Sequence, residues 1–491
     1  MADLTVLTTE RIAADAIGGD VTVVGTDTPP DCPPAWPGAA PAPGSPVAIA
    51  GVAHALEPGL RPGELLVASE LRGRDGAPPR LLPSAALLAR DLQQLGLSVR
   101  CGPLLSSPTP VTADQTRALA AAGALAWDTD SSPLAAPLAD HPLAVVRVVV
   151  DAGRPESVRS QLRAVGSLLG VRPSLERWAR ASGPHQVVLA GPRSFCAGVE
   201  RAIEIVERAL ARFGRPVYVR RQIVHNAHVV ADLEAKGAIF VTELDQVPDG
   251  ATVVLAAHGV SPAVRAAAAA RTDLMVIDAT CPLVAKVHHE ARRYLAEDYK
   301  MVLVGHADHE EVVGTMGEAP GRIALVERAE DVAALDFDDD DRVAYLTQTT
   351  LATDETATVV DALRQRFPDL VGPSAHDICY ATQNRQDAVR ALAARCQLVL
   401  VVGSTNSSNT ARLVEVARRE GCRAELLEDA SALWLGWLDG VSRIGVTAGA
   451  SAPEELVTGV VDALGRLGPL TLSEHRTTQE TVQFALPKQV R

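Results

Sequence analysis

The feature that most constrains this fold is an alternation of short apolar strands and helices that begins near residue 185. Each strand ends in small or polar residues, and helical segments separate many of them. In one such segment, AGVERAIEIVERALARFG, the side chains of Val199, Ile203, Val206 and Leu210 share one face. Strands that alternate with helices predict parallel α/β units. The expected strands lie in HQVVLAGPRSFCAG, ATVVLAAHGVS, LMVIDATCPLV, MVLVGHADHEE, RVAYLTQTT, LVLVVGSTNSS and RIGVTAGAS.

Three of the seven cysteines stand at strand-to-loop transitions of this region. Cys196, Cys281 and Cys379 are each flanked by Gly, Pro, Asp or Thr. In parallel α/β folds ligands bind beyond the carboxyl ends of strands, so these thiols are expected to face a cleft. The odd number of cysteines and the absence of a C-x-x-C pair argue against a disulfide framework. The remaining cysteines are interpreted as small buried hydrophobes: Cys32, Cys101, Cys396 and Cys422.

Three converging thiolates are compatible with two kinds of metal centre. They can hold an iron–sulfur cluster with one iron left open. They can equally hold a zinc ion with an open fourth position. The softness of sulfur does not choose between these alternatives.

Other strand ends carry groups suited to an anion. The imidazoles expected there are those of His225, His258 and His309. Ser407, Ser408 and Asn409 precede a helix whose N-terminus favours negative charge, and Ser451 repeats this pattern. The alternatives are polar core histidines and ordinary helix N-caps. None of these stretches matches a P-loop or a dinucleotide-binding pattern.

A carboxylate stands among these anion-binding groups. Glu311 follows His309 by two residues. A negative charge there is out of place unless it moves protons, which predicts a general acid or base. An exposed charge at a helix start is the alternative, and Glu310 is the better candidate for that role.

The composition sets outer limits. With 491 residues and 47% apolar residues the chain is expected to form two to four domains. A net charge of −14 argues against nucleic acid or an anionic membrane as partner. No apolar run is long enough to span a bilayer, and the N-terminus lacks a secretory pattern. A cytoplasmic location is therefore expected.

The N-terminal third follows a different pattern. Eight prolines fall within Pro29–Pro46, which predicts an irregular loop or linker. VAIAGVAHAL and LAVVRVVVDAG are expected strands, and PSAALLARDLQQLG is an expected helix. Gly183-Pro184 is a plausible boundary. The sequence therefore predicts two domains, residues 1–183 and residues 184–491.

From about His185 to Pro487 the chain resembles the LytB/IspH family of 4-hydroxy-3-methylbut-2-enyl diphosphate reductases. The strings that carry the resemblance are FCAGVERAI, VHNAHVV, AAHGVS, DATCPLVAKVH, VGHADHEEVVGTMGE, TQTTLATDET, HDICYATQNRQDAV, VVGSTNSSNTARL and GVTAGASAP. The family implies a trefoil of three α/β units around a central iron–sulfur cluster. It also implies reduction of (E)-4-hydroxy-3-methylbut-2-enyl diphosphate to isopentenyl and dimethylallyl diphosphate, the last step of the methylerythritol phosphate isoprenoid pathway. A ferredoxin or flavodoxin would donate the electrons.

The same resemblance implies a role for each site residue. Cys196, Cys281 and Cys379 would ligate a 4Fe-4S cluster. Glu311 would be the proton-relay carboxylate and Thr349 would help to orient the substrate. The positions that match the diphosphate-binding set and the pocket lining are His225, His258, His309, Ser407, Ser408, Asn409 and Ser451. One departure is that the family usually has a proline where Glu310 stands, and a second carboxylate there could perturb the pKa of Glu311.

The first 183 residues weakly resemble the nucleoside phosphorylase and nucleosidase superfamily. An Asp-Met-Glu-Ser string that contacts ribose in that family reads Asp128-Thr129-Asp130-Ser131 here. Asp151 matches a late aspartate of the family, although Val150 replaces the usual preceding Ser. We interpret this part as a truncated, degenerate α/β domain. The alternatives for the whole chain are a bifunctional protein with nucleosidase activity, a zinc-dependent hydrolase and a non-catalytic phosphate-binding regulator.

Overall fold

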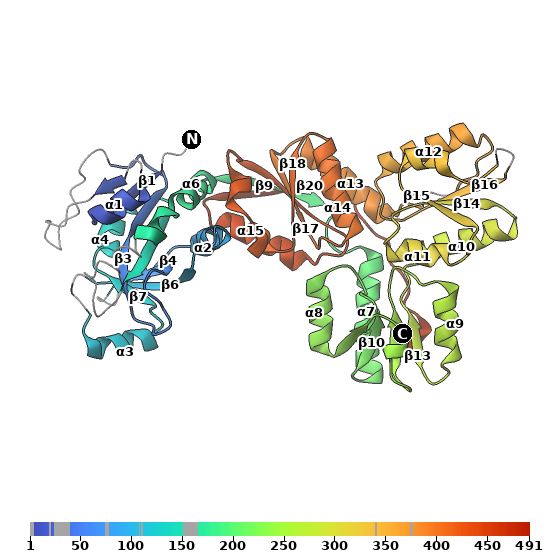
Figure 1. The fold of residues 1–491 in the computed structure, drawn as a ribbon, viewed down its shortest axis with the longest axis horizontal. Coiled ribbons are helices and arrows are strands. Elements are labelled where there is room, and N and C mark those ends of the chain that lie inside the picture. The colour runs from blue at the N-terminus through green and yellow to red at the C-terminus, as the bar shows by residue number, and fades with distance from the viewer. Residues whose placement is uncertain are drawn as a thin grey trace. The chain divides into compact units, whose positions relative to one another are not determined.

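The computed structural model divides the chain into two compact units (Figure 1). The N-terminal unit comprises Met1–Val187, Ser431–Ser442 and Val460–Thr471, and the C-terminal unit comprises Val188–Ala430, Arg443–Gly459 and Leu472–Arg491. The residues that the structure describes are 4–18, 21–23, 40–73, 78–107, 109, 111–150, 165–338, 341–373 and 377–491. Cys32, Asp151 and residues 29–39 of the proline-rich stretch lie outside the described residues.

The N-terminal unit is built on one mixed eight-stranded sheet. The strands are β1 (Thr5–Thr8), β2 (Val21–Val23), β3 (Val47–Ala55), β4 (Leu65–Arg72), β5 (Arg80–Leu81), β6 (Val99–Ser106), β7 (Ala126–Asp128) and β8 (Leu143–Val150). The order is β2-β1-β3-β7-β6-β4-β5, and β8 pairs with both β3 and β4. Strands β8, β3, β7, β6 and β4 therefore form a closed ring of pairings.

The expected elements of this unit are confirmed. VAIAGVAHAL contains β3, and LAVVRVVVDAG contains β8, in which every residue is buried as the continuous β-branched run predicts. PSAALLARDLQQLG contains α2, whose apolar face is buried. The helices described in this unit are α1 (Arg11–Ile17), α2 (Ala85–Gln94), α3 (Ala113–Ala121), α4 (Ser131–Ala135) and α6 (Arg172–Ala181).

The α/β rhythm that begins near residue 185 gives three separate sheets (Figure 1). The first has the order β11-β10-β12-β13, the second β15-β14-β16 and the third β18-β17-β19-β9-β20. The strand pairings of the first two sheets are parallel, as predicted. The strands are β9 (His185–Gly191), β10 (Val217–Arg220), β11 (Ala238–Val241), β12 (Thr252–Leu255), β13 (Met275–Asp278), β14 (Lys300–Val304), β15 (Ile323–Val326), β16 (Val343–Thr347), β17 (Leu398–Val402), β18 (Arg423–Leu427), β19 (Arg443–Ala448) and β20 (Leu470–Arg476).

Helices cover these sheets and bury their apolar faces. The helices are α7 (Ala197–Phe213), α8 (Ala227–Lys236), α9 (Pro262–Ala270), α10 (Pro282–Ala296), α11 (Glu310–Met316), α12 (Thr353–Arg366), α13 (Tyr380–Ala393), α14 (Ser408–Arg419) and α15 (Glu454–Gly465). On the first sheet, α7 and α8 pack against one face and α9 against the other. On the second sheet, α10 and α11 cover one face and α12 the other. Helices α13 and α14 pack on the third sheet. The predicted trefoil of three α/β units is confirmed.

The chain passes from one sheet to the next three times, and a cysteine begins the crossing helix each time. Cys196 is the N-cap of α7, between β9 of the third sheet and β10 of the first. Cys281 is the N-cap of α10, which leads to the second sheet, and Cys379 is the N-cap of α13, which leads back to the third. The topology therefore brings three thiols from distant parts of the sequence to equivalent positions. In the described part of the chain, no helix has the length and apolar character needed to cross a membrane.

Candidate active site

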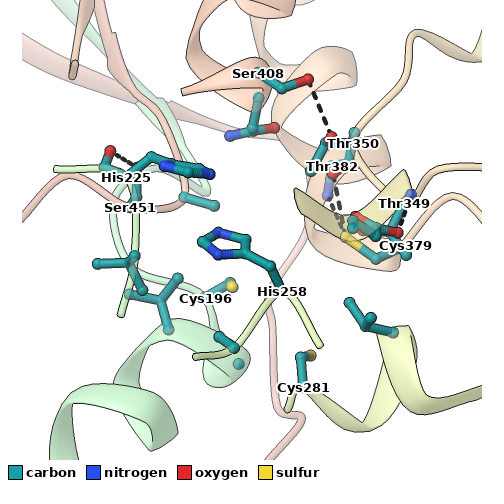
Figure 2. Close-up of a pocket in the computed structure, with 18 of the residues that line it drawn as sticks. Cys196, His225, His258, Cys281, Thr349, Thr350, Cys379, Thr382, Ser408 and Ser451 are labelled. Carbon is teal, nitrogen blue, oxygen red and sulfur yellow. Dashed lines mark hydrogen bonds between the residues drawn. The ribbon is translucent and has the colours of Figure 1, made fainter. Parts of the chain in front are cut away.

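The residues predicted to form the site line one pocket of the C-terminal unit (Figure 2). The twelve that meet there are Cys196, His225, His258, Cys281, His309, Glu311, Thr349, Cys379, Ser407, Ser408, Asn409 and Ser451. They come from loops and helix N-termini that follow strands of all three sheets, so the pocket lies where the three α/β units converge. Most of these residues were singled out by their place at strand ends, and Thr349 was identified only by the resemblance to the LytB/IspH family.

Backbone hydrogen bonds hold each cysteine beside a polar residue of the pocket. The N–H of Cys196 donates to the carbonyl of Ala450, which precedes Ser451, at 3.3 Å. The N–H of Cys281 donates to the carbonyl of Ala257, which precedes His258, at 2.9 Å. The N–H of Cys379 donates to the carbonyl of Thr349 at 3.1 Å. Each segment that passes from one sheet to the next is thus held by a backbone hydrogen bond at or beside a residue that lines the pocket.

The space among the thiols depends on a glycine. A Cβ added at Gly198 would lie 2.8 Å from Sγ of Cys281 and 3.7 Å from Sγ of Cys196, so only glycine leaves this space open. Among the described residues, no three His, Cys, Asp or Glu side chains are arranged to hold a single metal ion. The sulfurs therefore border a space rather than meet at one point.

Two of the thiols, those of Cys281 and Cys379, are poor anions in the protein alone. Burial raises the pKa of Cys281 to about 12, and the neighbouring Cys196 and Cys379 act in the same direction. Burial and then the charge of Cys196 raise the pKa of Cys379 to about 11. The N–H of Thr382 donates to Sγ of Cys379 at 3.3 Å, which only partly offsets this effect. Three thiolates are stable here only beside positive charge, which is the chemistry of a metal centre.

The imidazole rings of His225, His258 and His309 form a cluster in the same pocket as the thiols. The rings of His225 and His258 stack with centroids 4.1 Å apart, and His309 meets them edge-on at 5.6 and 5.9 Å. Burial lowers the pKa of His225. Burial followed by the charge of His225 lowers the pKa of His309 to about 4. The cluster is therefore neutral without a ligand and gains affinity for protons when an anion arrives.

The N-terminus of α14 completes a polar wall. Ser407 caps this helix by accepting a hydrogen bond from the N–H of Thr410, and Ser451 Oγ lies 3.3 Å from Ser407 Oγ. Both polar atoms of the Asn409 side chain are buried without a hydrogen-bond partner. Buried amides are rarely left unpaired, so this side chain is set for a ligand. Together with the helix N-terminus it suits an anion.

Glu311 is buried and lies within reach of the pocket. Its Oε1 accepts a hydrogen bond from the N–H of Thr349 at 2.8 Å, and its Oε2 accepts one from the Thr349 hydroxyl at 3.0 Å. Burial raises the pKa of Glu311 to about 7, against the lowering effect of these two hydrogen bonds. The carboxyl group can therefore hold or release a proton near neutral pH. The alternative of an exposed helix-start charge is wrong for Glu311, which is 2% exposed.

The sequence analysis missed two threonines of the pocket. Thr350 Oγ1 donates to Ser408 Oγ at 3.1 Å, and Thr382 contacts Sγ of Cys379. Thr350 adjoins Thr349 in the TQTT string, and Thr382 stands three residues after Cys379, where a helix N3 residue faces its N-cap. These spacings were visible in the sequence.

The cysteines outside the pocket have ordinary surroundings. Cys422 is buried and Cys396 half-buried, as predicted for core residues. Cys101 is exposed on β6, so its interpretation as a buried hydrophobe is wrong.

In the N-terminal unit, the residues aligned with the ribose-contacting string surround one arginine. Arg147 of β8 is fully buried, and its guanidinium lies 2.8 Å from both Asp128 Oδ2 and Asp130 Oδ1. It also donates to the hydroxyl of Ser131. A Cβ at Gly51 would collide with its Nη1, so the guanidinium fills the space beside β3. Both aspartates are thus engaged within the protein.

The fold and the pocket define a class of protein. Three α/β units that meet at three thiols, an anion-binding wall and a buried carboxyl group form an enzyme site for metal-assisted chemistry on an anionic substrate. Comparison identifies the family: residues 187–465 match the model of the LytB protein family. The chain belongs to the LytB family.

Two relatives show the extent of this similarity. A 4-hydroxy-3-methylbut-2-enyl diphosphate reductase from Acidothermus cellulolyticus is 58% identical over 307 residues, which cover 62% of this chain and 90% of the relative. A solved structure, the E-1-hydroxy-2-methyl-but-2-enyl-4-diphosphate reductase from Plasmodium falciparum, is 39% identical with a TM-score of 0.60. That match covers 63% of this chain and 97% of the other.

A further solved structure is similar over a different share of the chain. The 5'-methylthioadenosine/S-adenosyl homocysteine nucleosidase of Helicobacter pylori is 17% identical with a TM-score of 0.27, over 35% of this chain and 95% of the other.

Proposed function

We propose that the chain is a 4-hydroxy-3-methylbut-2-enyl diphosphate reductase of the methylerythritol phosphate isoprenoid pathway. It converts (E)-4-hydroxy-3-methylbut-2-enyl diphosphate to isopentenyl and dimethylallyl diphosphate by reductive dehydroxylation. The observation that carries this proposal is the single pocket in which three thiols, an anion-binding wall and a protonatable carboxyl meet. Membership of the LytB family supports the same substrate and reaction.

Cys196, Cys281 and Cys379 would hold a 4Fe-4S cluster. The donor set fits, because all three thiols line the pocket, burial raises the pKa of Cys281 and Cys379, and Gly198 keeps the space among the thiols open. When bound, the cluster supplies electrons and a Lewis-acidic iron for the allylic oxygen. The N-termini of α7, α10 and α13 direct their partial positive charge at the thiolates and stabilise them further.

The polar wall would bind the diphosphate end of the substrate. His225, His258 and His309 offer ring N–H groups, and the unpaired amide of Asn409 offers a buried donor. The hydroxyls that complete the wall are those of Ser407, Ser408 and Ser451. A diphosphate fixed at this wall holds the substrate's reacting carbon at a constant distance from the thiols, which lowers the entropic cost of reaction.

Glu311 would supply a proton to the leaving hydroxyl. A carboxyl with a pKa of about 7 is protonated in a large fraction of molecules at neutral pH. Oγ1 of Thr349 lies 3.0 Å from Oε2 of Glu311. The protonated carboxyl group would donate a hydrogen bond to Oγ1, and the hydroxyl of Thr349 would pass its own proton to the substrate. The reaction consumes two electrons and two protons. One proton leaves with the hydroxyl as water, and the other reaches either end of the allylic unit, which gives the two products.

The electrons would come from a small redox protein, a ferredoxin or flavodoxin. The direct test uses cluster-loaded protein with a chemical reductant, so that no natural donor is needed. We expect isopentenyl and dimethylallyl diphosphate to appear in amounts that consume two electrons per substrate. Loaded protein that binds the substrate but forms neither product would contradict the proposal.

We further propose that residues 1–183 form a degenerate domain without nucleosidase activity. Asp128 and Asp130, which align with the ribose-contacting string, both pair with the buried Arg147. Carboxylates that are already paired cannot bind a sugar without leaving the guanidinium unpaired. The full-length chain is therefore expected to release no adenine from methylthioadenosine. Release at an enzymatic rate would show that the domain is active.

A further inference from the structure

Glu310, which stands where the LytB family usually has a proline, faces a histidine of the pocket. Its Oε2 lies 3.8 Å from Nδ1 of His258, and its side chain is only 19% exposed. Its Oε1 lies 3.5 Å from Nη1 of Arg221. The carboxyl group therefore lies between an arginine and an imidazole. The expectation that Glu310 is a plain exposed helix-start charge does not describe this environment.

The nitrogen that faces Glu310 lacks a partner. Nδ1 of His258 is buried and makes no hydrogen bond. A separation of 3.8 Å exceeds a hydrogen bond, but a movement of about 1 Å would form one. Burial, together with the rings of His225 and His309, holds the pKa of His258 well below its usual value. The contact in the ligand-free protein is therefore not an ion pair.

His309 shows the contrasting arrangement. Its Nδ1 accepts a hydrogen bond from the N–H of Glu311 at 3.2 Å. The proton of the neutral ring is thereby fixed on Nε2, so His309 can donate to an anion without becoming charged. In His258 a carboxylate faces Nδ1, which favours a proton at that nitrogen. Nε2 of His258 can then donate to an anion only if the ring carries both protons.

We propose that Glu310 is a positioning residue for the diphosphate. When the diphosphate enters, Glu310 accepts a hydrogen bond from Nδ1–H of His258 and holds that ring as a doubly protonated, cationic donor. The inference rests on the proposed function, because it assumes that the pocket binds a diphosphate. It follows the general pattern in which a carboxylate behind a histidine fixes its proton and raises its basicity.

The surrounding charges are consistent with this role. The titratable groups that face His258 are His225, His309 and Glu310. Arg221 and Arg220 act on Glu310 from the other side and favour its charged form, while burial raises its pKa. Glu243 pairs with both arginines and neutralises part of their charge. Glu310 also lines a second hollow, together with Arg220, Arg221 and Ser261.

The test compares Glu310→Gln with the unaltered protein, both loaded with iron and sulfide. Glutamine keeps the size and can accept a hydrogen bond, but it cannot stabilise a cationic ring. Inorganic pyrophosphate is the probe, and calorimetry in two buffers of different ionisation enthalpy counts the protons taken up on binding. We expect the variant to bind pyrophosphate about 10-fold more weakly or worse, and to take up about one proton fewer at pH 8. KM for the substrate should rise similarly, with iron content and kcat near the original values.

Asp308→Asn is the matched control. Asp308 is an exposed carboxylate in the same loop, and its removal changes the net charge equally. We expect pyrophosphate affinity and proton uptake in this variant to match the original protein. Unchanged or tighter pyrophosphate binding by Glu310→Gln would overturn the inference, because it would make Glu310 a bystander or merely a repelling charge. An original protein that neither binds pyrophosphate nor reduces the substrate would instead overturn the proposed function, and the inference with it.

Discussion

The two units of this chain both gather polar groups at strand ends, but they treat them differently. In the N-terminal unit, the guanidinium of Arg147 pairs with both Asp128 and Asp130, although its Nη1 has no hydrogen-bond partner. In the C-terminal pocket, the Asn409 amide and Nδ1 of His258 are buried without partners. The two N-terminal carboxylates are thus held by a cation of the protein itself, whereas both polar atoms of the Asn409 amide are open to a ligand.

The largest expected effect is the loss of a thiol from the pocket. Cys281→Ser should remove most of the iron and sulfide from anaerobically purified protein, because Cys281 would supply one of three ligands. Losing a residue that only supports a metal ligand typically costs about 10- to 100-fold in activity. Losing a ligand itself should therefore lower turnover by more than about 100-fold. Iron and sulfide analysis with an absorption spectrum measures this.

Cys422→Ser is the control for that variant. Cys422 is buried in the core of the third sheet and does not line the pocket. Its serine variant should keep its iron. If both variants lost iron equally, the distinction between pocket and core thiols would fail.

Next in size is the loss of the buried acid. Glu311→Gln should keep the cluster and bind substrate, but kcat should fall by about 10²- to 10⁴-fold because the amide cannot donate an acidic proton. Steady-state kinetics on iron-matched samples provide the measurement. A near-normal kcat would remove Glu311 from the mechanism.

Substitutions in the N-terminal cluster of Arg147, Asp128 and Asp130 should lower the free energy of unfolding and leave turnover unchanged. Arg147→Met leaves the buried Asp128 and the partly buried Asp130 without their cation, and breaking a buried pair in this way typically costs about 3–5 kcal/mol. Arg100→Met, which breaks an exposed pair with Glu57, should cost about 1 kcal/mol or less. Chemical denaturation followed by fluorescence would measure both, and kcat of the folded protein should stay constant. A large loss of kcat with unchanged stability would reverse the comparison.

The smallest effect is the dependence of turnover on pH. Burial raises the pKa of Glu311 to about 7, so its acid form is full below that pH and declines above it. We expect kcat to fall about tenfold per unit well above pH 7. The residual activity of Glu311→Gln should lack this inflection. An identical pH profile in both proteins would assign the titration to another group.

Much of the fold and site followed from the sequence, for identifiable reasons. Short strands ending in small or polar residues placed Cys196, His258 and Ser451 at strand ends, and parallel sheets bring such ends together. Spacing did not show that Asp130 pairs with Arg147, because Arg147 lies within an otherwise apolar β-branched strand. The spacing of residues also did not show that Glu310 faces His258, because His258 follows β12 of the first sheet and Glu310 follows β14 of the second.

Two features of the pocket, the contact of Thr350 with Ser408 and the raised pKa of Glu311, could not be predicted from local sequence patterns. Thr350 meets Ser408 although they are 58 residues apart, and no local pattern predicts that contact. The raised pKa of Glu311 arises from its burial in the folded protein, where it is 2% exposed. Local periodicity predicts the elements, whereas burial of charge is a property of the assembled core.

The most direct test of the central claim is a Mössbauer spectrum of the anaerobically purified, iron-57-loaded protein, recorded with and without substrate. Three cysteine ligands around a 4Fe-4S cluster leave one iron distinct from the other three. The account predicts about four irons per chain, with one iron signal that shifts when the substrate is added. A folded, colourless protein without iron would contradict the proposed cluster. A cluster whose iron signals do not change when the substrate is added would contradict the proposed binding of substrate to it.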